Sequence, residues 1–352
     1  MKNRYSRIDR FLHSLALGKK SVRALSFDIN QSFLNLEDDT HREKPHVFVA
    51  GLARSGTSIL LDVLFRSGNF STLTYRHMPF VLAPNLWLKV NRTHRRTAGK
   101  VERAHGDGIK VDFDSPEAFE EVFWLTFCEK YVHDEGIEVQ AEDAISRDTL
   151  NKFVLFVQSV VSSSGSNGAS NRYLSKNNNN VIRLTSLRRS FPHAHIVIPF
   201  RNPSDHALSL CRQHDRFSQM QSDDPYVRDY MNWLGHHEFG LDHKPFLVAG
   251  IEETLEYDRE TPNYWLSYWI NIHRHLMVSA PPGSIFVNHD RLCACPEIYL
   301  DRLADRLSLR RESLDHSMLK ARRSQFRTDF DPVMLAVAEE LFENLMCLDS
   351  TV

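Results

Sequence analysis

The sequence has few cysteines, almost no net charge and no long apolar run, and each shortage excludes a class of protein. The five cysteines are odd in number and scattered, which argues against a disulfide framework and favours a reducing, cytoplasmic location. With 43 Lys+Arg against 45 Asp+Glu, the formal charge of −2 argues against a nucleic-acid binder. The longest apolar run, at residues 153–161, is too short to cross a bilayer and is interrupted by Gln158 and Ser159.

The first twenty residues are basic and weakly apolar. As a signal peptide they lack a continuous apolar core, and Lys19 and Lys20 stand where a small-residue cleavage site would be. The spacing of their apolar residues predicts an amphipathic surface helix instead. These residues are Ile8, Phe11, Leu12 and Leu15. A peripheral membrane contact and a signal peptide are the alternative interpretations.

Short apolar runs predict buried strands, because none of them alternates cleanly with polar residues. They cover residues 46–50, 173–174, 195–200 and 284–287. Helical patterns follow or separate them, at about residues 115–127, 143–161, 181–190, 203–217, 261–269 and 332–346. Strands alternating with helices indicate an α/β fold with a parallel sheet flanked by helices. In such folds ligands collect at the carboxyl ends of the strands.

One domain accounts for most of this pattern. We expect residues 45–347 to form a single α/β domain, preceded by a lead-in at residues 1–44. The segments at about 91–170 and 219–261 are expected to be insertions around the site.

The clearest local motif is a strand, a glycine-bounded turn and an apolar helix at residues 46–64. Gly51 and Gly56 have the spacing of a Walker A loop, which predicts a sheet like that of the P-loop NTPases. Backbone N–H groups around residues 55–58 would point into the loop, and the N-terminus of the helix would add partial positive charge. The loop is therefore a candidate anion site.

The lysine of a Walker A loop is missing, because Thr57 follows Gly56. A nucleoside triphosphatase needs that lysine on the β- and γ-phosphates. Here Thr57 and Ser58 add hydroxyl donors, and Arg54 supplies a cation from within the loop, beside Ser55. This arrangement suits a single terminal group and its bridging oxygen. The alternative is a glycine turn that binds nothing.

A second candidate anion site follows the strand at residues 195–200. Asn202 is a good N-cap and Pro203 fits the first helical position, which places Arg201 beside a helix N-terminus. Ser209 lies two turns into that helix, where it can face the same cleft. An arginine with a hydroxyl is a sensible clamp for a separate phosphate. Taken alone, the motif also fits a capped helix with a surface arginine.

Together the two motifs resemble the sulfotransferase superfamily, which uses the sulfate donor 3′-phosphoadenosine 5′-phosphosulfate (PAPS). In that family an R/K-S-G-T-[TS] loop after the first strand holds the 5′-phosphosulfate, and residues 54–58 match it. An R-x-P motif with a serine eight residues after the arginine holds the 3′-phosphate, and Arg201, Pro203 and Ser209 match it. Weaker similarities lie at residues 175–177 and 285–296.

The resemblance implies roles for these residues. Arg54 and Lys176 would stabilise the transferring sulfuryl group, while Arg201 and Ser209 would read the 3′-phosphate. The loop amides would hold the 5′-phosphate together with the hydroxyls of Thr57 and Ser58. Sulfuryl transfer resembles phosphoryl transfer, in which the protein mostly positions groups and neutralises charge. No metal ion is implied.

The general base is not evident from the motifs. Related enzymes place a glutamate a little over twenty residues after the loop cation, or a histidine much later. Near the first position there is no carboxylate, and His77 is the nearest group whose ordinary pKa of about 6.5 suits a base. His105 is the second candidate, with Asp107 as its orienting partner or as a base itself. A residue outside this set is the remaining alternative.

The leading hypothesis is therefore a PAPS-dependent sulfotransferase, acting in line and without a metal on a hydroxyl or amine of a small-molecule or glycan acceptor. A nucleotide kinase or NTPase is a second hypothesis, which the threonine at position 57 disfavours. A non-catalytic nucleotide- or partner-binding protein on the same fold is a third.

Overall fold

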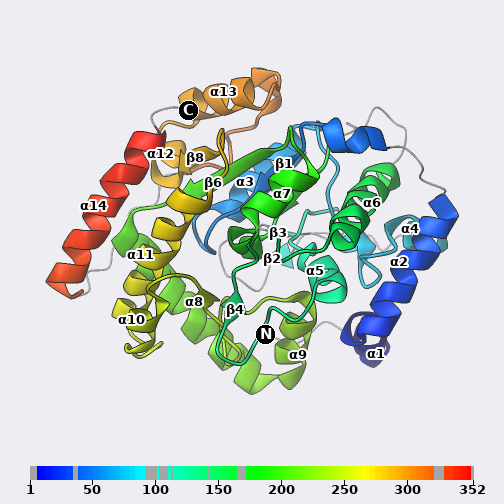
Figure 1. The fold of residues 1–352 in the computed structure, drawn as a ribbon, viewed down its shortest axis with the longest axis horizontal. Coiled ribbons are helices and arrows are strands. Elements are labelled where there is room, and N and C mark those ends of the chain that lie inside the picture. Colours follow the sequence, from blue (N-terminus) through cyan, green and yellow to red (C-terminus); the bar gives the residue numbers. More distant parts are fainter. Residues whose placement is uncertain are drawn as a thin grey trace.

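Parallel strands form the centre of the structure, and helices cover both faces of the sheet (Figure 1). The computed structural model describes residues 6–34, 39–91, 101–102, 110–111, 114–141, 143–164, 172–320 and 329–349. In spatial order the strands of the central sheet are β5 (Leu174–Lys176), β1 (Val47–Val49), β6 (His195–Phe200) and β8 (Ile285–Asn288). Each overlaps one of the predicted apolar runs, which confirms the predicted α/β class.

The two faces of the sheet carry separate apolar clusters, because side chains alternate along each strand. Phe48, Ile196 and Ile198 pack on one face with apolar residues of helices α6, α7, α8, α11 and α14. Val49 and Val197 pack on the other face with α3, α12 and α13. Both faces are therefore buried, as the non-alternating apolar runs predicted.

Among the described residues, the helices that cover the sheet or follow it are α3 (Thr57–Arg66), α6 (Arg147–Ser163), α7 (Leu184–Ser190), α8 (Pro203–Asp223), α11 (Pro262–Ser279), α12 (His289–Ala294), α13 (Pro296–Arg306) and α14 (Pro332–Asp349). The others are α1 (Arg7–Gly18), α2 (Lys20–Leu34), α4 (Pro84–Val90), α5 (Glu121–Phe127), α9 (Pro225–Leu234) and α10 (Ile251–Leu255). Short 3₁₀ helices are η1 (Asp39–Glu43), η2 (Tyr75–His77), η4 (Asn178–Ile182) and η5 (Arg311–Ser313). Two-residue strands pair as β2 (Val101–Glu102) with β3 (Lys110–Val111) and as β4 (Ile137–Glu138) with β7 (Phe246–Leu247).

One predicted helix start is wrong. Ser115 and Pro116 do not open a helix, and α5 begins only at Glu121. Instead Pro116 forms a bridge with Thr74, and the amide of Glu117 donates to the carbonyl of Leu73 at 3.1 Å. Pairing with a distant segment therefore keeps this stretch extended, although its local sequence has a good capping pattern.

The predicted helix at residues 181–190 is interrupted at Arg183, which separates η4 from α7. At this break the Arg183 side chain forms two hydrogen bonds with the carboxylate of Glu121, at 2.6 and 2.9 Å. Arg183 is fully buried and Glu121 is 2% exposed in their side chains. An ion pair in the core thus accompanies the interruption, and it links the helices that follow β5 to α5.

The N-terminal segment has a helix, α1, but its apolar stripe faces outward. Ile8 is 78% exposed and Phe11 is 69% exposed, whereas His13, Ala16 and Leu17 are buried. The N-terminal segment thus forms a surface helix, and its apolar residues Ile8 and Phe11 are exposed. Helices α1 and α2 (blue) lie at the end of the molecule opposite α14 (red) in Figure 1. Within the described ranges, no helix has the length and hydropathy needed to cross a bilayer.

Candidate active site

The loop between β1 and α3 contains two residues with positive φ angles. Arg54 has a φ of 70° and Gly56 a φ of 97°, both in the left-handed region. This conformation costs roughly 1–2 kcal/mol for an ordinary residue, so Arg54 is held there by its surroundings. The amides that open α3 have no acceptor within the helix, because Gly56 is its N-cap. The buried Ser55 hydroxyl has no hydrogen-bond partner among the described residues.

The loop and the second motif meet through a direct contact. The Nε atom of Arg54 donates to the Oγ atom of Ser209, at 3.2 Å. Arg54 follows β1, while Ser209 lies two turns into α8, which follows β6. These strands are neighbours in the sheet, with Val49 opposite Val197. The carboxyl ends of two adjacent parallel strands therefore bring both residues to one edge.

Arg201 is held at the same edge by carboxylates. Its Nε atom lies 3.3 Å from Asp290, which also accepts a hydrogen bond of 2.8 Å from the amide of Asn202. The side chain of Asn202 accepts from the amide of Asp205, so the predicted N-cap of α8 is present. The Arg201 side chain is 18% exposed and remains accessible to a ligand.

His289 packs on the loop and is affected by the charges of Arg54 and Arg201. A Cβ atom added to Gly56 would lie only 2.3 Å from Nδ1 of His289, so the ring packs directly on the loop. Burial lowers the pKa of His289 to about 4, helped by the charges of Arg201 and Arg54 and opposed by Asp290. The guanidinium charges of Arg54 and Arg201 thus both lower the pKa of His289. The two candidate anion motifs therefore lie next to each other at the carboxyl edge of the sheet.

His206 fixes the backbone of the loop from α8. Its Nδ1 atom accepts from the indole N–H of Trp269 at 3.1 Å, which leaves the proton on Nε2. That Nε2–H then donates to the carbonyl of Ala53 at 2.8 Å. His206 and Ser209 are three residues apart on α8 and therefore share a face. One helix face thus contacts the loop at both Ala53 and Arg54.

Lys176 ends β5 opposite Val49, directly beside the start of the loop. Asn178, two residues after Lys176, links the loop to the carboxylate of Glu238. Its Oδ1 atom accepts from the hydroxyl of Thr57 at 3.4 Å, and its Nδ2 atom donates to Oε1 of Glu238 at 2.7 Å. The charge of Lys176 acts on the same Glu238 carboxylate. Of the loop hydroxyls, Ser58 is half-buried at the start of α3.

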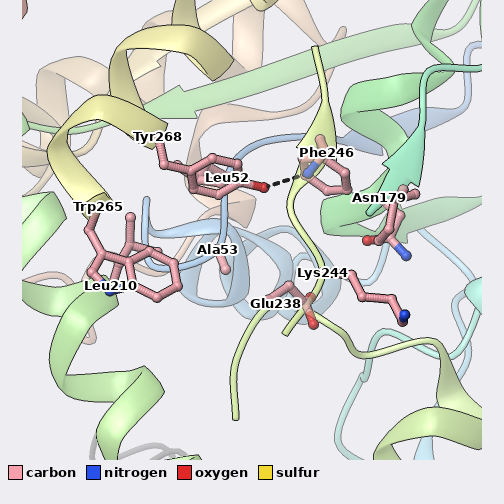
Figure 2. Close-up of a pocket in the computed structure, with 10 residues that line it drawn as sticks. Leu52, Ala53, Asn179, Leu210, Glu238, Lys244, Phe246, Trp265 and Tyr268 are labelled. Carbon is pink, nitrogen blue, oxygen red and sulfur yellow. Dashed lines mark hydrogen bonds between the residues drawn. The ribbon is translucent and has the colours of Figure 1, made fainter. Parts of the chain in front are cut away.

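A pocket lies beside this network, as Figure 2 shows. The loop contributes Leu52 and Ala53, and most other lining side chains are apolar or aromatic. Its charged lining residues are Glu238 and Lys244. The remaining lining residues are Ile137, Asn179, Leu210, Phe246, Trp265 and Tyr268. The pocket is therefore continuous with the loop and presents a carboxylate to it.

His77 is engaged in hydrogen bonds within η2 and its surroundings. Its Nδ1 atom accepts from the amide of Thr74 at 2.9 Å, so the proton lies on Nε2. Nε2 contacts Oγ of Ser163 at 3.2 Å, and that hydroxyl itself donates to the carbonyl of Val160. Burial lowers the pKa of His77 to about 4, and the ring is 4% exposed. These contacts favour a structural role and disfavour His77 as the base.

The other candidates for the base, His105 and Asp107, lie outside the described residues. Sequence reasoning missed His206, His289 and Glu238. Two of them carried a signal, because His206 shares a helix face with Ser209 and His289 directly follows β8. Glu238 carried none, since it lies in a connection between α9 and β7. Within the described ranges, no three His, Cys, Asp or Glu side chains are grouped as metal ligands.

Comparison with known proteins agrees with this geometry. The sequence profile of the sulfotransferase family matches residues 45–313, which include the loop, Lys176, Arg201 and Ser209. The chain belongs to the sulfotransferase family. No curated protein matches the chain significantly in sequence.

Among solved structures, the chain is similar to sulfotransferase STF9 from Mycobacterium avium. The TM-score is 0.52 at 14% identity, over 98% of this chain and 86% of the other. It is also similar to a sulfotransferase from Alicyclobacillus acidocaldarius, with a TM-score of 0.41 at 14% identity, over 88% of this chain and 95% of the other. At 14% identity, the similarity to STF9 supports the fold alone. The TM-score of the second similarity is too low to support the fold.

Proposed function

We propose that the protein transfers a sulfuryl group from PAPS to a hydroxyl or amine acceptor. The observation that supports the proposal is the contact between Arg54 and Ser209, since it brings the two candidate anion motifs next to each other. A donor with a 5′-phosphosulfate and a 3′-phosphate needs two such sites at a fixed separation. An ATP-dependent kinase would need only the loop, and the loop lacks its lysine.

In this proposal the loop amides and the hydroxyls of Thr57 and Ser58 hold the 5′-phosphate. Arg54 and Lys176 neutralise charge on the sulfuryl group and the bridging oxygen. The acceptor oxygen forms a bond to sulfur as the bond from sulfur to the bridging oxygen breaks. The electron pair of the broken bond stays on the 5′-phosphate, and the acceptor proton passes to a base. The protein contributes orientation and preorganised positive charge.

Arg201 and Ser209 would bind the 3′-phosphate and so distinguish the donor from plain adenylates. Asp290 orients the Arg201 guanidinium through the contact at 3.3 Å. Charge-assisted hydrogen bonds of this kind contribute about 1.5–3 kcal/mol each. Loss of the 3′-phosphate contacts should therefore weaken binding about tenfold to a hundredfold.

Isothermal titration with adenosine 3′,5′-bisphosphate and with 5′-AMP tests the proposal. We expect much tighter binding of the bisphosphate, and Arg201→Ala should remove most of the difference. Arg216→Ala, at an exposed position of the same helix, is the matched control and should leave both affinities unchanged. Equal affinity for the two nucleotides would contradict the donor assignment. Tighter binding of ATP with Mg²⁺ would favour a kinase or NTPase instead.

A further inference from the structure

The first two helices carry rows of exposed apolar side chains. In each helix three large apolar residues recur three or four positions apart, so they lie along one face. The rows are Ile8, Phe11 and Leu15 on α1, and Leu25, Ile29 and Phe33 on α2. Among the described residues these are six of the thirteen large apolar side chains that are exposed. Such a concentration is typical of a surface that binds a partner.

The opposite faces of both helices pack on the rest of the protein. On α1 the ring of His13 lies 5.7 Å from that of Tyr230 in α9. On α2 the ring of Phe27 packs edge-on against Phe123 and Phe127 of α5, with centroids 6.2 and 4.9 Å apart. These contacts fix the rotation of each helix about its axis. The folded chain therefore holds both apolar rows outward.

Basic residues flank the rows. Residues 6–34 contain five basic and two acidic residues, a formal charge of +3 in a chain whose overall charge is −2. Arg7 precedes the row on α1, and Lys19 and Lys20 follow it, all three exposed. At the far end of the row on α2, Nζ of Lys89 lies 4.1 Å from the ring centroid of Phe33. The apolar rows thus lie in a locally positive surface.

The two acidic residues of this segment offset little of that charge. Asp9 accepts hydrogen bonds from the amide and the hydroxyl of Ser6, at 3.1 and 2.8 Å, as part of the cap of α1. Asp28 is exposed on α2. A partner that matches this surface therefore has an apolar layer and negative charge beside it.

We propose that α1 and α2 bind the surface of a membrane that contains anionic lipid. The apolar rows would enter the boundary between headgroups and acyl chains, while Arg7, Lys19 and Lys20 would contact lipid phosphates. With 12 and 15 residues, the two helices are shorter than the roughly 20 residues that span a bilayer, so they would lie along its surface. This inference does not depend on the proposed sulfotransferase function.

A second copy of the chain is the other partner that an apolar surface could bind. A twofold interface brings the same surface of both copies together. The positive charge around the rows of one copy would then meet the positive charge of the other. Charge complementarity favours the lipid surface for this reason.

Co-sedimentation of the full chain with lipid vesicles tests the inference. We expect binding to vesicles of phosphatidylcholine and phosphatidylglycerol in equal parts, and much weaker binding to phosphatidylcholine alone. Raising the salt from about 0.1 M to about 1 M shortens the screening length from about 10 Å to about 3 Å, so it should also weaken binding. Absence of binding to the anionic vesicles, or equal binding to both kinds, would overturn the inference.

Substitutions at exposed positions locate the contact. Ile8→Ser with Phe11→Ser should weaken binding to anionic vesicles about tenfold, because apolar side chains are lost from the interface. Val333→Ser, exposed on α14 at the opposite end of the molecule (Figure 1), is the matched control and should change nothing. Arg7→Gln should weaken binding about fivefold, whereas Arg310→Gln, at an exposed position after α13, should not. Unchanged binding in the serine double variant would overturn the inference.

Analytical ultracentrifugation of the unaltered protein and of the serine double variant separates lipid from a second copy. A dimer that these substitutions convert to a monomer, without vesicle binding, would overturn the proposal. Vesicle binding that the substitutions remove supports it at any oligomeric state. Binding of adenosine 3′,5′-bisphosphate and the melting temperature should be the same in the variants, since all four positions are exposed. A chain that binds vesicles but no bisphosphate would contradict the proposed function alone.

Discussion

The Nε atom of Arg54 lies 3.2 Å from the Oγ atom of Ser209, although the two residues are 155 positions apart in the chain. Each belongs to a separate candidate anion-binding motif at the carboxyl end of a different strand. Their contact places the two motifs next to each other, with His289 packed against the loop at Gly56. This relationship makes the energetic coupling between the two motifs testable.

Ser209→Ala should weaken binding of adenosine 3′,5′-bisphosphate by about tenfold to a hundredfold, since a hydrogen bond to a charged group contributes about 1.5–3 kcal/mol. Binding of 5′-AMP should change less, because that ligand lacks the 3′-phosphate. Titration calorimetry on the variant measures both effects. Ser218→Ala, on the same helix, is the control. An equal loss for both nucleotides would mean that Ser209 acts only by positioning Arg54.

His206 should act as a positioning residue for the loop. Its removal in His206→Ala leaves the Ala53 carbonyl and the Trp269 N–H without their partners, so we expect weaker bisphosphate binding by about tenfold. His206→Gln carries a donor of similar reach and should recover part of the affinity. Affinities and the separate changes in KM and kcat are the readouts. If glutamine recovers thermal stability without recovering affinity, the role of His206 is structural alone.

The ion pair between Arg183 and Glu121 should be required for stability rather than for binding. Arg183→Met leaves a buried carboxylate without its partner, which should lower the free energy of unfolding by about 3–5 kcal/mol. The double variant with Glu121→Leu should be less destabilised, because neither charge of the pair remains. Urea unfolding measures the free energy of unfolding of both variants. Arg311→Ala removes an exposed pair with Asp305 and should change little. A double variant no more stable than Arg183→Met would contradict this account.

Stability should fall as the pH falls below about 6.5. Burial lowers the pKa of His46 to about 3 and that of His273 to about 4 in the folded protein. Between those values and 6.5 the unfolded chain binds protons that the folded protein does not. Each such histidine therefore removes about 1.4 kcal/mol of stability per pH unit in that window. Unfolding by urea at pH 7.5, 6 and 5 measures the slope, and a flat profile would contradict buried neutral histidines.

Short sequence motifs predicted the loop before α3 and the capped start of α8. The loop at residues 51–58 and the capped start of α8 follow from short segments whose conformation depends on their own glycines and caps. The Ser115–Pro116 start was wrong because pairing of Pro116 with the distant Thr74 overrides a good cap. Glu238 could not be found in this way, since only the folded chain places it beside Asn178.

The most direct test of the central claim is transfer of labelled sulfate from PAPS to phenol and cyclohexanol, followed by the mass of the product. We predict a sulfated product and stoichiometric adenosine 3′,5′-bisphosphate, with the rate unaffected by EDTA and nearly abolished in Arg54→Ala. A protein that binds the bisphosphate but transfers no sulfate to any acceptor tested, or that transfers phosphate from ATP instead, would contradict the account.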